Sequence, residues 1–210
     1  MIPLVVRSHC SLMWGTSAPE HLPVAARQHG YRRIALTDTD NLYGLWPFLQ
    51  ACGEEGVTPI VGAEVSEPGS QRRVVCLVEN DDGYRNLCRL ITRRHCKQDF
   101  LLKSDLPGLS AGLCVLVPSA DLLTPLYEAG VNVAAALPRR PSPSAGKARA
   151  EAQRLGVPAV AVPSSFFLVP PSFPMRAPTL FPPTFISCLM VLTSFRLSGI
   201  LFRYQGISSR

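Results

Sequence analysis

The stretch IALTDTDNLYG, residues 34–44, sets the interpretation of this chain because it joins an apolar strand to a helix through a polar turn. The apolar run ends at Thr37-Asp38-Thr39-Asp40, and residues near helical spacing follow it. Two carboxylates at a strand end could form a metal-binding or catalytic corner together with Glu64. Alternatively, Asp38 accepts hydrogen bonds from turn amides while Asp40 or Asn41 caps the following helix. We favour this second, structural interpretation, because Asx residues at helix starts are commonly caps.

Strand-like and helix-like segments alternate on both sides of this turn. Apolar runs predict strands at 3–7, 31–38, 57–65, 72–80, 112–118, 131–137 and 157–163. Amphipathic or capped segments predict helices at 17–30, 41–56, 81–96 and 147–156. This alternation indicates the α/β class, with a mainly parallel sheet or barrel and helices outside it. In such folds the functional site lies at the carboxyl ends of the strands.

The composition fits an intracellular globular protein. Apolar residues make up 47% of the chain, which is enough for a core, and the net charge of +6 is compatible with a polyanionic partner without specifying one. The seven cysteines have no CxxC spacing, so we expect reduced thiols in a cytoplasm. Arg7 and His9 interrupt the apolar N-terminus, and no signal peptide fits there.

The chain divides into two unequal parts, residues 1–168 and residues 169–210. The second part is rich in proline and apolar residues, and no acidic residue follows Glu151. Its longest apolar run is about ten residues, whereas a membrane span needs roughly 20. We hypothesise that 169–210 is an out-of-frame or otherwise aberrant extension without an evolved fold. The alternative is a lineage-specific hydrophobic tail.

Three segments together resemble one family: VVRSHCSLMWGTSAPEHLPVAARQHGYRRIALTDTDNLYG (5–44), TPIVGAEV (58–65) and VCLVENDDGYRNLCRLITRRH (75–95). They resemble the N-terminal PHP (polymerase and histidinol phosphatase) domain of bacterial DNA polymerase III α-subunits. The portions SLMWGTSAPE, LTDTDNLYG and ENDDGYRNLCRL are specific to the polymerase branch. The resemblance covers residues 3 to 168 and implies a distorted seven-stranded β/α barrel, which we expect to be incomplete here.

In active members of this family, His, Asp and Glu side chains at the strand ends hold divalent zinc, manganese or magnesium. These metals activate water for phosphoester hydrolysis. In this sequence the opening His-x-His of the family falls on Val5 and Arg7. The Asp before Gly in the following turn falls on Trp14, and the His of the Thr-Asp-His turn falls on Thr39.

The remaining ligand positions are also changed, with one exception. The Glu of the Gly-x-Glu strand is kept, as Glu64, while the His that begins the next strand falls on Arg73. The late Asp-x-His falls on Ser164 and Phe166. Valine, tryptophan and phenylalanine offer no lone pair to a cation, and one carboxylate does not hold a catalytic metal. The resemblance therefore implies a degenerate metal site with no resident metal and a catalytically inactive chain.

Two further groups of residues have a functional and a plainer interpretation. His9 follows the serine of the family motif, and we interpret it as a solvated loop residue in preference to a metal ligand. A set of basic side chains could face nucleic acid or a partner, or could equally form a solvated face. That set comprises Arg72, Arg73, Arg89, Arg93, Arg94 and Lys97.

Three functions follow from this sequence. The first is a non-catalytic PHP domain, a structural and interaction module of a DNA polymerase III α-subunit-like protein in DNA replication, here a fragment without the polymerase palm. In the family this domain contacts the polymerase core and a proofreading exonuclease, with DNA bound indirectly and no membrane involved. The second is a divergent metal-dependent phosphoesterase or 3′–5′ exonuclease that uses Glu64, Asp38, Asp40 and His9. The third is a pseudogene-like product that does not fold stably.

Overall fold

A computed structural model of the chain describes residues 2–138, 140 and 142–162. Ser164, Phe166 and the tail at 169–210 lie outside these residues, so the predictions made for them stay predictions.

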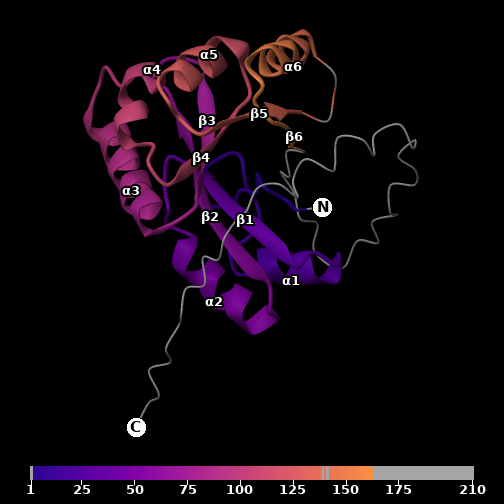
Figure 1. Ribbon diagram of the computed structural model, residues 1–210. Coiled ribbons are helices and arrows are strands. Elements are labelled where there is room, and N and C mark those ends of the chain that lie inside the picture. Colours follow the sequence, from indigo (N-terminus) through magenta and orange to yellow (C-terminus); the bar gives the residue numbers. More distant parts are fainter. Residues whose placement is uncertain (1, 139, 141, 163–210) are drawn as a thin grey trace, which may run out of the picture. The chain divides into compact units, whose positions relative to one another are not determined.

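Strands and helices alternate along most of the described chain, with β2 and β3 following one another directly, which confirms the α/β class (Figure 1). The strands are β1 (Arg33–Thr39), β2 (Thr58–Ser66), β3 (Arg73–Val78), β4 (Leu113–Val117), β5 (Val133–Leu137) and β6 (Ala159–Ala161). The helices are α1 (His21–Gln28), α2 (Leu45–Glu55), α3 (Asp81–Cys96), α4 (Leu102–Asp105), α5 (Ala120–Glu128) and α6 (Pro143–Leu155), with a 3₁₀ turn, η1, at Pro107–Leu109.

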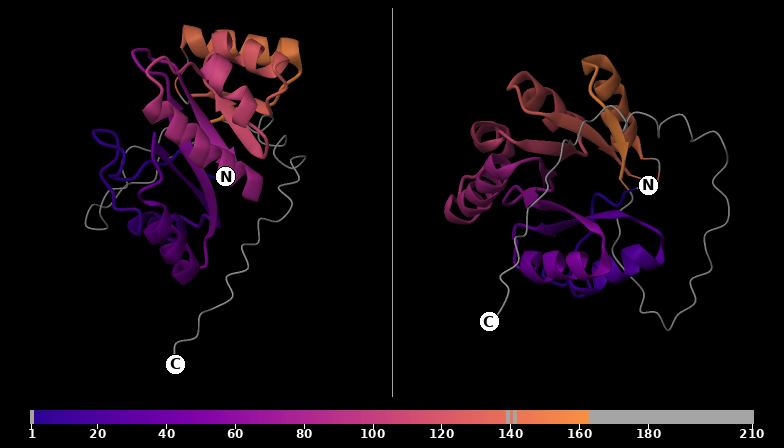
Figure 2. Two further views of the ribbon diagram at one scale, coloured as in Figure 1. Left: turned by 90° about the vertical axis from the view of Figure 1, so that its left-hand side faces the viewer. Right: turned by 60° about the horizontal axis from the view of Figure 1, so that its bottom comes forward.

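The six strands form one sheet in sequence order, β1-β2-β3-β4-β5-β6. The pairs β1–β2, β4–β5 and β5–β6 are parallel, whereas β3 is antiparallel to both of its neighbours. The link from β2 to β3, residues 67–72, is too short for the crossover that a parallel pair requires. The sheet curls into a half-barrel, consistent with the expected incomplete PHP-type barrel (Figure 2).

The N-terminal run 3–7 is an extended segment beside β1 and makes only a single bridge. The amide of Ala35 donates to the Pro3 carbonyl at 2.9 Å, and the amide of Thr37 donates to the Val6 carbonyl at 2.8 Å. This segment therefore follows β1 at the first edge of the sheet and places residue 7 beside the end of that strand.

The outer face of the sheet packs on the helices in two apolar clusters. Helices α1 and α2 cover β1 through a cluster around Phe48, and helices α3 to α6 cover β2 to β5 through a larger cluster around Leu87 and Leu90 (Figures 1 and 2). Phe48, Leu87 and Leu90 have no exposed surface. Burial of this kind stabilises by about 25 cal/mol for each Å² of apolar surface removed from water.

The inner face of the curled sheet carries a third apolar cluster. It alternates with the outer cluster along each strand, since successive side chains of a strand point to opposite faces. The members are Val5, Ala35, Val75, Leu77, Leu116, Ala134, Ala136 and Val162. Towards the carboxyl ends of β1 and β2, the residues with inward parity become polar, and the candidate site lies there.

Two local features, the start of α2 and the presence of α5, differ from the predictions. Helix α2 begins at Leu45 with Gly44 at its N-cap, so neither Asp40 nor Asn41 caps it as expected. Asn41 instead accepts a hydrogen bond from the amide of Tyr43 at 3.1 Å and orders the turn before the helix. Helix α5 was not predicted, because Pro125 interrupts its pattern, yet three leucines of that helix are buried.

A pair of glycines gives a test of this packing. A Cβ atom at Gly83 would lie 1.9 Å from the carbonyl oxygen of Gly112, whereas a Cβ atom at Gly53 would have nothing within 4 Å. We expect Gly83→Ala to lower the free energy of unfolding by about 1–3 kcal/mol. Gly53→Ala should raise it by about 1 kcal/mol, because alanine is the better helix former. Urea unfolding of the two variants measures both changes. Equal changes in the free energy of unfolding would contradict the close packing of Gly83 in α3 against the Gly112 carbonyl.

Candidate functional site

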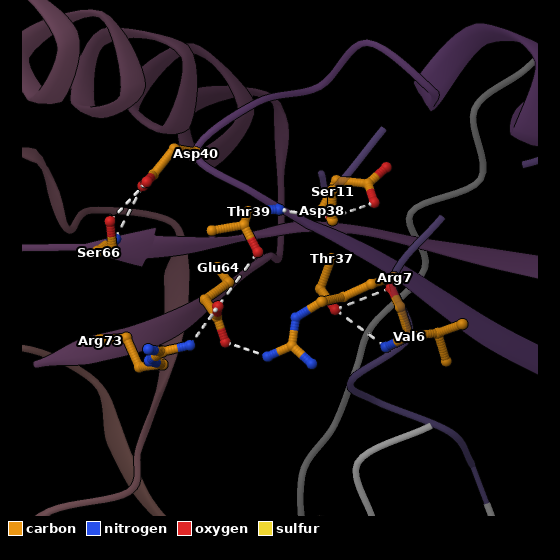
Figure 3. A network of polar contacts seen from close by, with 10 residues as sticks. All are labelled: Val6, Arg7, Ser11, Thr37, Asp38, Thr39, Asp40, Glu64, Ser66 and Arg73. Atoms are coloured by element: carbon orange, nitrogen blue, oxygen red, sulfur yellow. Dashed lines mark hydrogen bonds and ion pairs between the residues drawn. The ribbon is translucent and has the colours of Figure 1, made fainter. Parts of the chain in front are cut away.

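The carboxylate of Glu64 is the centre of the candidate site. Glu64 is 2% exposed on β2 and pairs with Arg7, whose Nη2 donates to its Oε2. Its other oxygen, Oε1, accepts a hydrogen bond from Thr39 Oγ1 at 3.2 Å and one from Arg73 Nη1 at 3.4 Å (Figure 3). Both oxygens of the carboxylate are therefore occupied by donors, and two of the three donors are cations.

Strand register explains why these residues meet. Thr39 is the direct partner of Glu64 in the parallel β1–β2 pair, so their side chains share the inner face. Arg73 opens β3 opposite Ser66 and has the same parity as Glu64. Arg7 reaches them from the N-terminal segment, which is held on β1 by the bonds of Val6 to Thr37.

Trp14 lies over both arginines. The Arg7 guanidinium carbon is 5.9 Å from the centroid of the indole, and that of Arg73 is 5.2 Å from it. Both distances are within the range of cation–π attraction. The indole is 44% exposed, so it covers the arginines on one side and meets solvent on another.

Several of the positions that the resemblance assigns to metal ligands lie close together. Arg7, Thr39 and Arg73 donate to Glu64, and Trp14 lies over the two arginines. Val5 lies apart from them, buried in the inner apolar cluster. Ser164 and Phe166 lie outside the described residues.

The chemistry of this cluster does not fit a divalent metal. No group of three or more His, Cys, Asp or Glu side chains within the described residues is placed to hold a metal ion. Glu64 provides the carboxylate oxygens, but Arg7 and Arg73 already neutralise them. A cation at this point would face two guanidinium groups with one carboxylate to share between them.

Asp38 has a separate and buried set of partners. Its carboxylate accepts hydrogen bonds from the amide and hydroxyl of Ser8 and from the hydroxyl of Ser11, each at 2.7 Å. The Ser11 hydroxyl also accepts from the amide of Thr39 at 2.9 Å. Asp38 is 1% exposed, so these bonds satisfy a buried charge and fix the loop that carries Trp14. The structural interpretation of Asp38 agrees with these contacts.

Asp40 has a third set of partners. It adopts a left-handed backbone conformation, φ 56°, which aspartate tolerates better than most residues. Its carboxylate accepts hydrogen bonds from the amide of Ser66 at 2.8 Å and from the Ser66 hydroxyl at 2.5 Å (Figure 3). It also pairs with Arg94 at 3.3 Å. His95 contacts the Asp40 carbonyl at 2.7 Å. Asp40 therefore joins β1 and β2 to helix α3.

His9 is exposed in the loop before α1, with its amide bonded to the carbonyl of Ser17 at 2.8 Å. The carboxylates of Asp38, Asp40 and Glu64 each accept hydrogen bonds from a different group of residues. The His9 side chain is not among the hydrogen-bond donors described for these three carboxylates. The remnant ligand Glu64 and the three weak candidates Asp38, Asp40 and His9 therefore form no metal-holding group of three or more within the described residues.

Carboxylates within the fold pair with most of the predicted basic set. Asp105 forms ion pairs with Lys97 at 3.0 Å and with Arg93 at 3.7 Å, and Asp40 forms one with Arg94. Arg89 differs from these, because its one hydrogen bond among the described residues is a 3.5 Å contact with Asn86. The Arg72 side chain pairs with Glu67 and Asp121.

Asp105 was missed by the sequence analysis, although it is buried. Burial raises the pKa of its carboxyl, but hydrogen bonds from the Leu101 amide and Lys97, together with Arg93, outweigh this and lower the pKa. Ser8, Ser11 and Ser66 were missed as well. A buried Asp predicts that hydroxyl or amide donors surround it, but sequence spacing does not identify them.

Solved structures define the class of this fold. A Bifidobacterium adolescentis protein described as a metal-dependent phosphoesterase superposes with a TM-score of 0.56 at 11% identity, covering 77% of this chain and 86% of that one. A Chromobacterium violaceum amidohydrolase with bound sulfate and no metal superposes with a TM-score of 0.55 at 16% identity, with the same coverage. At these identities the likeness concerns the fold alone, which is that of PHP-like phosphoesterases.

The particular family follows from the sequence. The PHP domain model matches residues 3–128, more than half of the chain, and the chain belongs to the PHP domain family. The resemblance noted from the sequence is thereby confirmed.

Curated relatives are DNA polymerases. An error-prone DNA polymerase of Pseudomonas aeruginosa is 40% identical over 114 residues, 52% of this chain and 11% of its own length. One from Anaeromyxobacter sp. (strain K) is 38% identical over 94 residues, 43% of this chain and 8% of its own length. The DNA polymerase III subunit alpha of Streptococcus pyogenes is 31% identical over 99 residues, 45% of this chain and 9% of its own length. The chain thus spans about a tenth of the length of these relatives.

No helix within the described residues combines the length and the apolar content that a membrane span requires.

The ion pair at Glu64 gives a testable change in stability. Glu64→Gln removes the charge that compensates Arg7, which is 6% exposed. We expect the free energy of unfolding to fall by about 3–5 kcal/mol, because an uncompensated buried charge remains. Glu54→Gln, on the exposed end of α2, is the matched control and should change it by less than about 0.5 kcal/mol. Similar urea midpoints for the two variants would contradict the role of Glu64.

The lowered pKa of Asp105 gives a pH dependence of known sign. Since the folded-state pKa is below the ordinary value, the stabilisation is present above about pH 4 and is lost as pH falls through the folded pKa. The stability gap between the native chain and Asp105→Asn should therefore shrink from about pH 6 to about pH 3. Urea unfolding across this range measures the gap, with Asp82→Asn on the exposed side of α3 as the control. A gap that does not depend on pH would contradict the assignment.

Proposed function

We propose that this chain is a non-catalytic PHP domain with a degenerate metal site, a structural and interaction module of a DNA polymerase III α-subunit-like protein. The observation that carries the proposal is the placement of Glu64 between Arg7 and Arg73. This glutamate is the one retained ligand of the family set, and both of its oxygens already accept hydrogen bonds.

Electrostatics favours the arginines over a metal at this point. Two like unit charges 4 Å apart repel by about 4 kcal/mol at an effective dielectric constant of 20, and a divalent ion near two guanidinium groups multiplies that cost. Arg7 is covalently part of the chain and is already buried against Glu64. The guanidinium groups therefore provide the positive charge that a metal would provide, without its ability to activate water.

The polymerase context rests on the names of the relatives, which are error-prone polymerases and polymerase III α-subunits. We propose a role in DNA replication or repair synthesis in the cytoplasm, with the polymerase core and a proofreading exonuclease as partners and DNA bound indirectly. On this proposal residues 1–168 form the PHP domain, and residues 169–210 are an aberrant extension.

A second candidate is a divergent metal-dependent phosphoesterase or exonuclease. It is favoured by the fold, which is shared with a protein described as a metal-dependent phosphoesterase. It requires metal from a set of residues that includes Glu64, Asp38 and Asp40. Each of these carboxylates has separate protein partners, so metal binding would have to displace buried hydrogen bonds or ion pairs.

Metal content separates the two candidates. We expect the purified chain, after incubation with manganese or zinc and desalting, to hold far less than one metal ion per molecule. It should also show no hydrolysis of a phosphodiester above a metal-only blank. Its thermal midpoint should be unchanged by EDTA, because no resident metal stabilises the fold.

A variant controls this measurement. Arg7→His, Thr39→His and Arg73→His, combined in one chain, replace both arginines by neutral ligands around Glu64 and should raise zinc binding. Stoichiometric metal in the native chain, or metal-dependent hydrolysis lost in Glu64→Gln, would support the phosphoesterase candidate and overturn the proposal.

A further inference from the structure

A hollow of about 490 Å³ opens to solvent at the amino ends of β1 and β2. One wall comes from the segment 27–32, which leads from α1 into β1, and the other from the segment 53–57, which leads from α2 into β2. Glu64 lies towards the other end of β2, opposite Thr39 at the end of β1, so the hollow is separate from the candidate site. Pockets that hold small ligands have volumes of about 300–1,000 Å³, and the hollow therefore has room for a small molecule.

The backbone of the α2 wall presents carbonyl groups that lack a donor. The amides of Gly56 and Val57 both donate to the carbonyl of Cys52. Within the described residues no donor outside the helix reaches the next three carbonyls, those of residues 53–55. The amides that follow α1, in contrast, donate to carbonyls of its last turn. Because a helix C-terminus carries about half a negative charge, the α2 wall has the more negative backbone.

Gly53 leaves this wall uncovered. It lines the hollow, and because glycine has no side chain it does so with its backbone. A Cβ atom at this position would have nothing within 4 Å. The end of α2 is therefore accessible to a hydrogen-bond donor on a ligand.

The charged side chains of the two walls have opposite signs. Arg27 and Arg32 belong to the α1 wall, and Glu54 and Glu55 belong to the α2 wall. One ion pair crosses between the walls, from Arg27 Nη1 to Glu55 Oε2 at 3.1 Å. Within the described residues the Arg32 side chain makes no ion pair or hydrogen bond, and Glu54 accepts a 3.3 Å hydrogen bond from Gln50. Among these residues, Arg32 and Glu54 thus form a cation and a carboxylate on facing walls that do not pair with each other.

We propose that this hollow binds a zwitterionic amino acid. Arg32 pairs with the carboxylate of the ligand, and Glu54 receives its ammonium group together with the carbonyls at the end of α2. Tyr31 is half-buried on the same wall as Arg32 and offers an aromatic ring to the side chain of the ligand. An apolar side chain therefore suits the site. The inference goes beyond the proposed function and uses none of the residues that contact Glu64.

An NMR titration of the full chain tests the site. The probes are L-phenylalanine and two compounds that each keep one of its charges, namely phenethylamine, which lacks the carboxylate, and 3-phenylpropionate, which lacks the ammonium group. The amides of Gly53 and Gly56 report on the hollow, and the amide of Gly108, which does not line it, is the reference.

We expect saturable shifts of the two hollow amides with L-phenylalanine. The dissociation constant should be on the order of 10 mM, because the charged groups are exposed and each ion pair adds little. Each single-charge compound should bind about threefold to fivefold more weakly, since it loses one exposed ion pair.

Two variants assign each charge to its wall. Arg32→Gln should weaken the binding of L-phenylalanine about threefold to fivefold and leave that of phenethylamine unchanged. Glu54→Gln should weaken L-phenylalanine by a similar factor and leave 3-phenylpropionate unchanged. Arg33→Gln removes an exposed arginine that does not line the hollow, and it should change none of the three affinities. Arg32→Lys keeps the charge and should retain most of the binding, which provides a second readout if Arg32→Gln does not fold.

Three results would overturn the proposal. They are the absence of a saturable shift of the hollow amides with L-phenylalanine, equal affinities for the three compounds, and an equal loss of binding in Arg32→Gln and Arg33→Gln.

Discussion

The buried pair between Arg7 and Glu64 is the interaction on which the strand-end edge depends. It connects the N-terminal segment to β2 across 57 residues of sequence, and both side chains are at most 6% exposed. Either charge alone would be costly at this depth. The pair therefore requires that the N-terminal segment stay on β1, and it holds residue 7 beside Thr39 and Arg73.

Three carboxylates near the strand ends, Asp38, Asp40 and Glu64, are neighbours in the sheet, yet each faces a different part of the molecule. Asp38 holds the loop before α1, Asp40 holds helix α3, and Glu64 holds the two arginines. An active metal site needs such groups to point at one centre. Here the same residue types connect separate segments, which supports a structural role without requiring any change of fold.

Much of this arrangement could be predicted from the sequence. The alternation of apolar runs predicted the α/β class, and the family resemblance assigned Thr39 and Glu64 to one set of ligand positions. The antiparallel direction of β3 depends on the short 67–72 link, which the alternating pattern alone does not show. The serine partners of Asp38 lie 27 and 30 residues away in sequence, and the stacking of Trp14 depends on a loop. These contacts are set by tertiary packing, which local propensity and periodicity do not predict.

The reversed direction of β3 has a consequence for the order of folding. Arg73 and Glu64 are nine residues apart and meet through a tight antiparallel pair, whereas Arg7 is 57 residues from the same carboxylate. Closing a short loop loses less chain entropy than closing a long one, so local contacts of this kind form early. We therefore expect the β2–β3 hairpin to bring Arg73 to Glu64 before the N-terminal segment brings Arg7. In that order Glu64 already has a cationic partner when the longer connection to Arg7 closes.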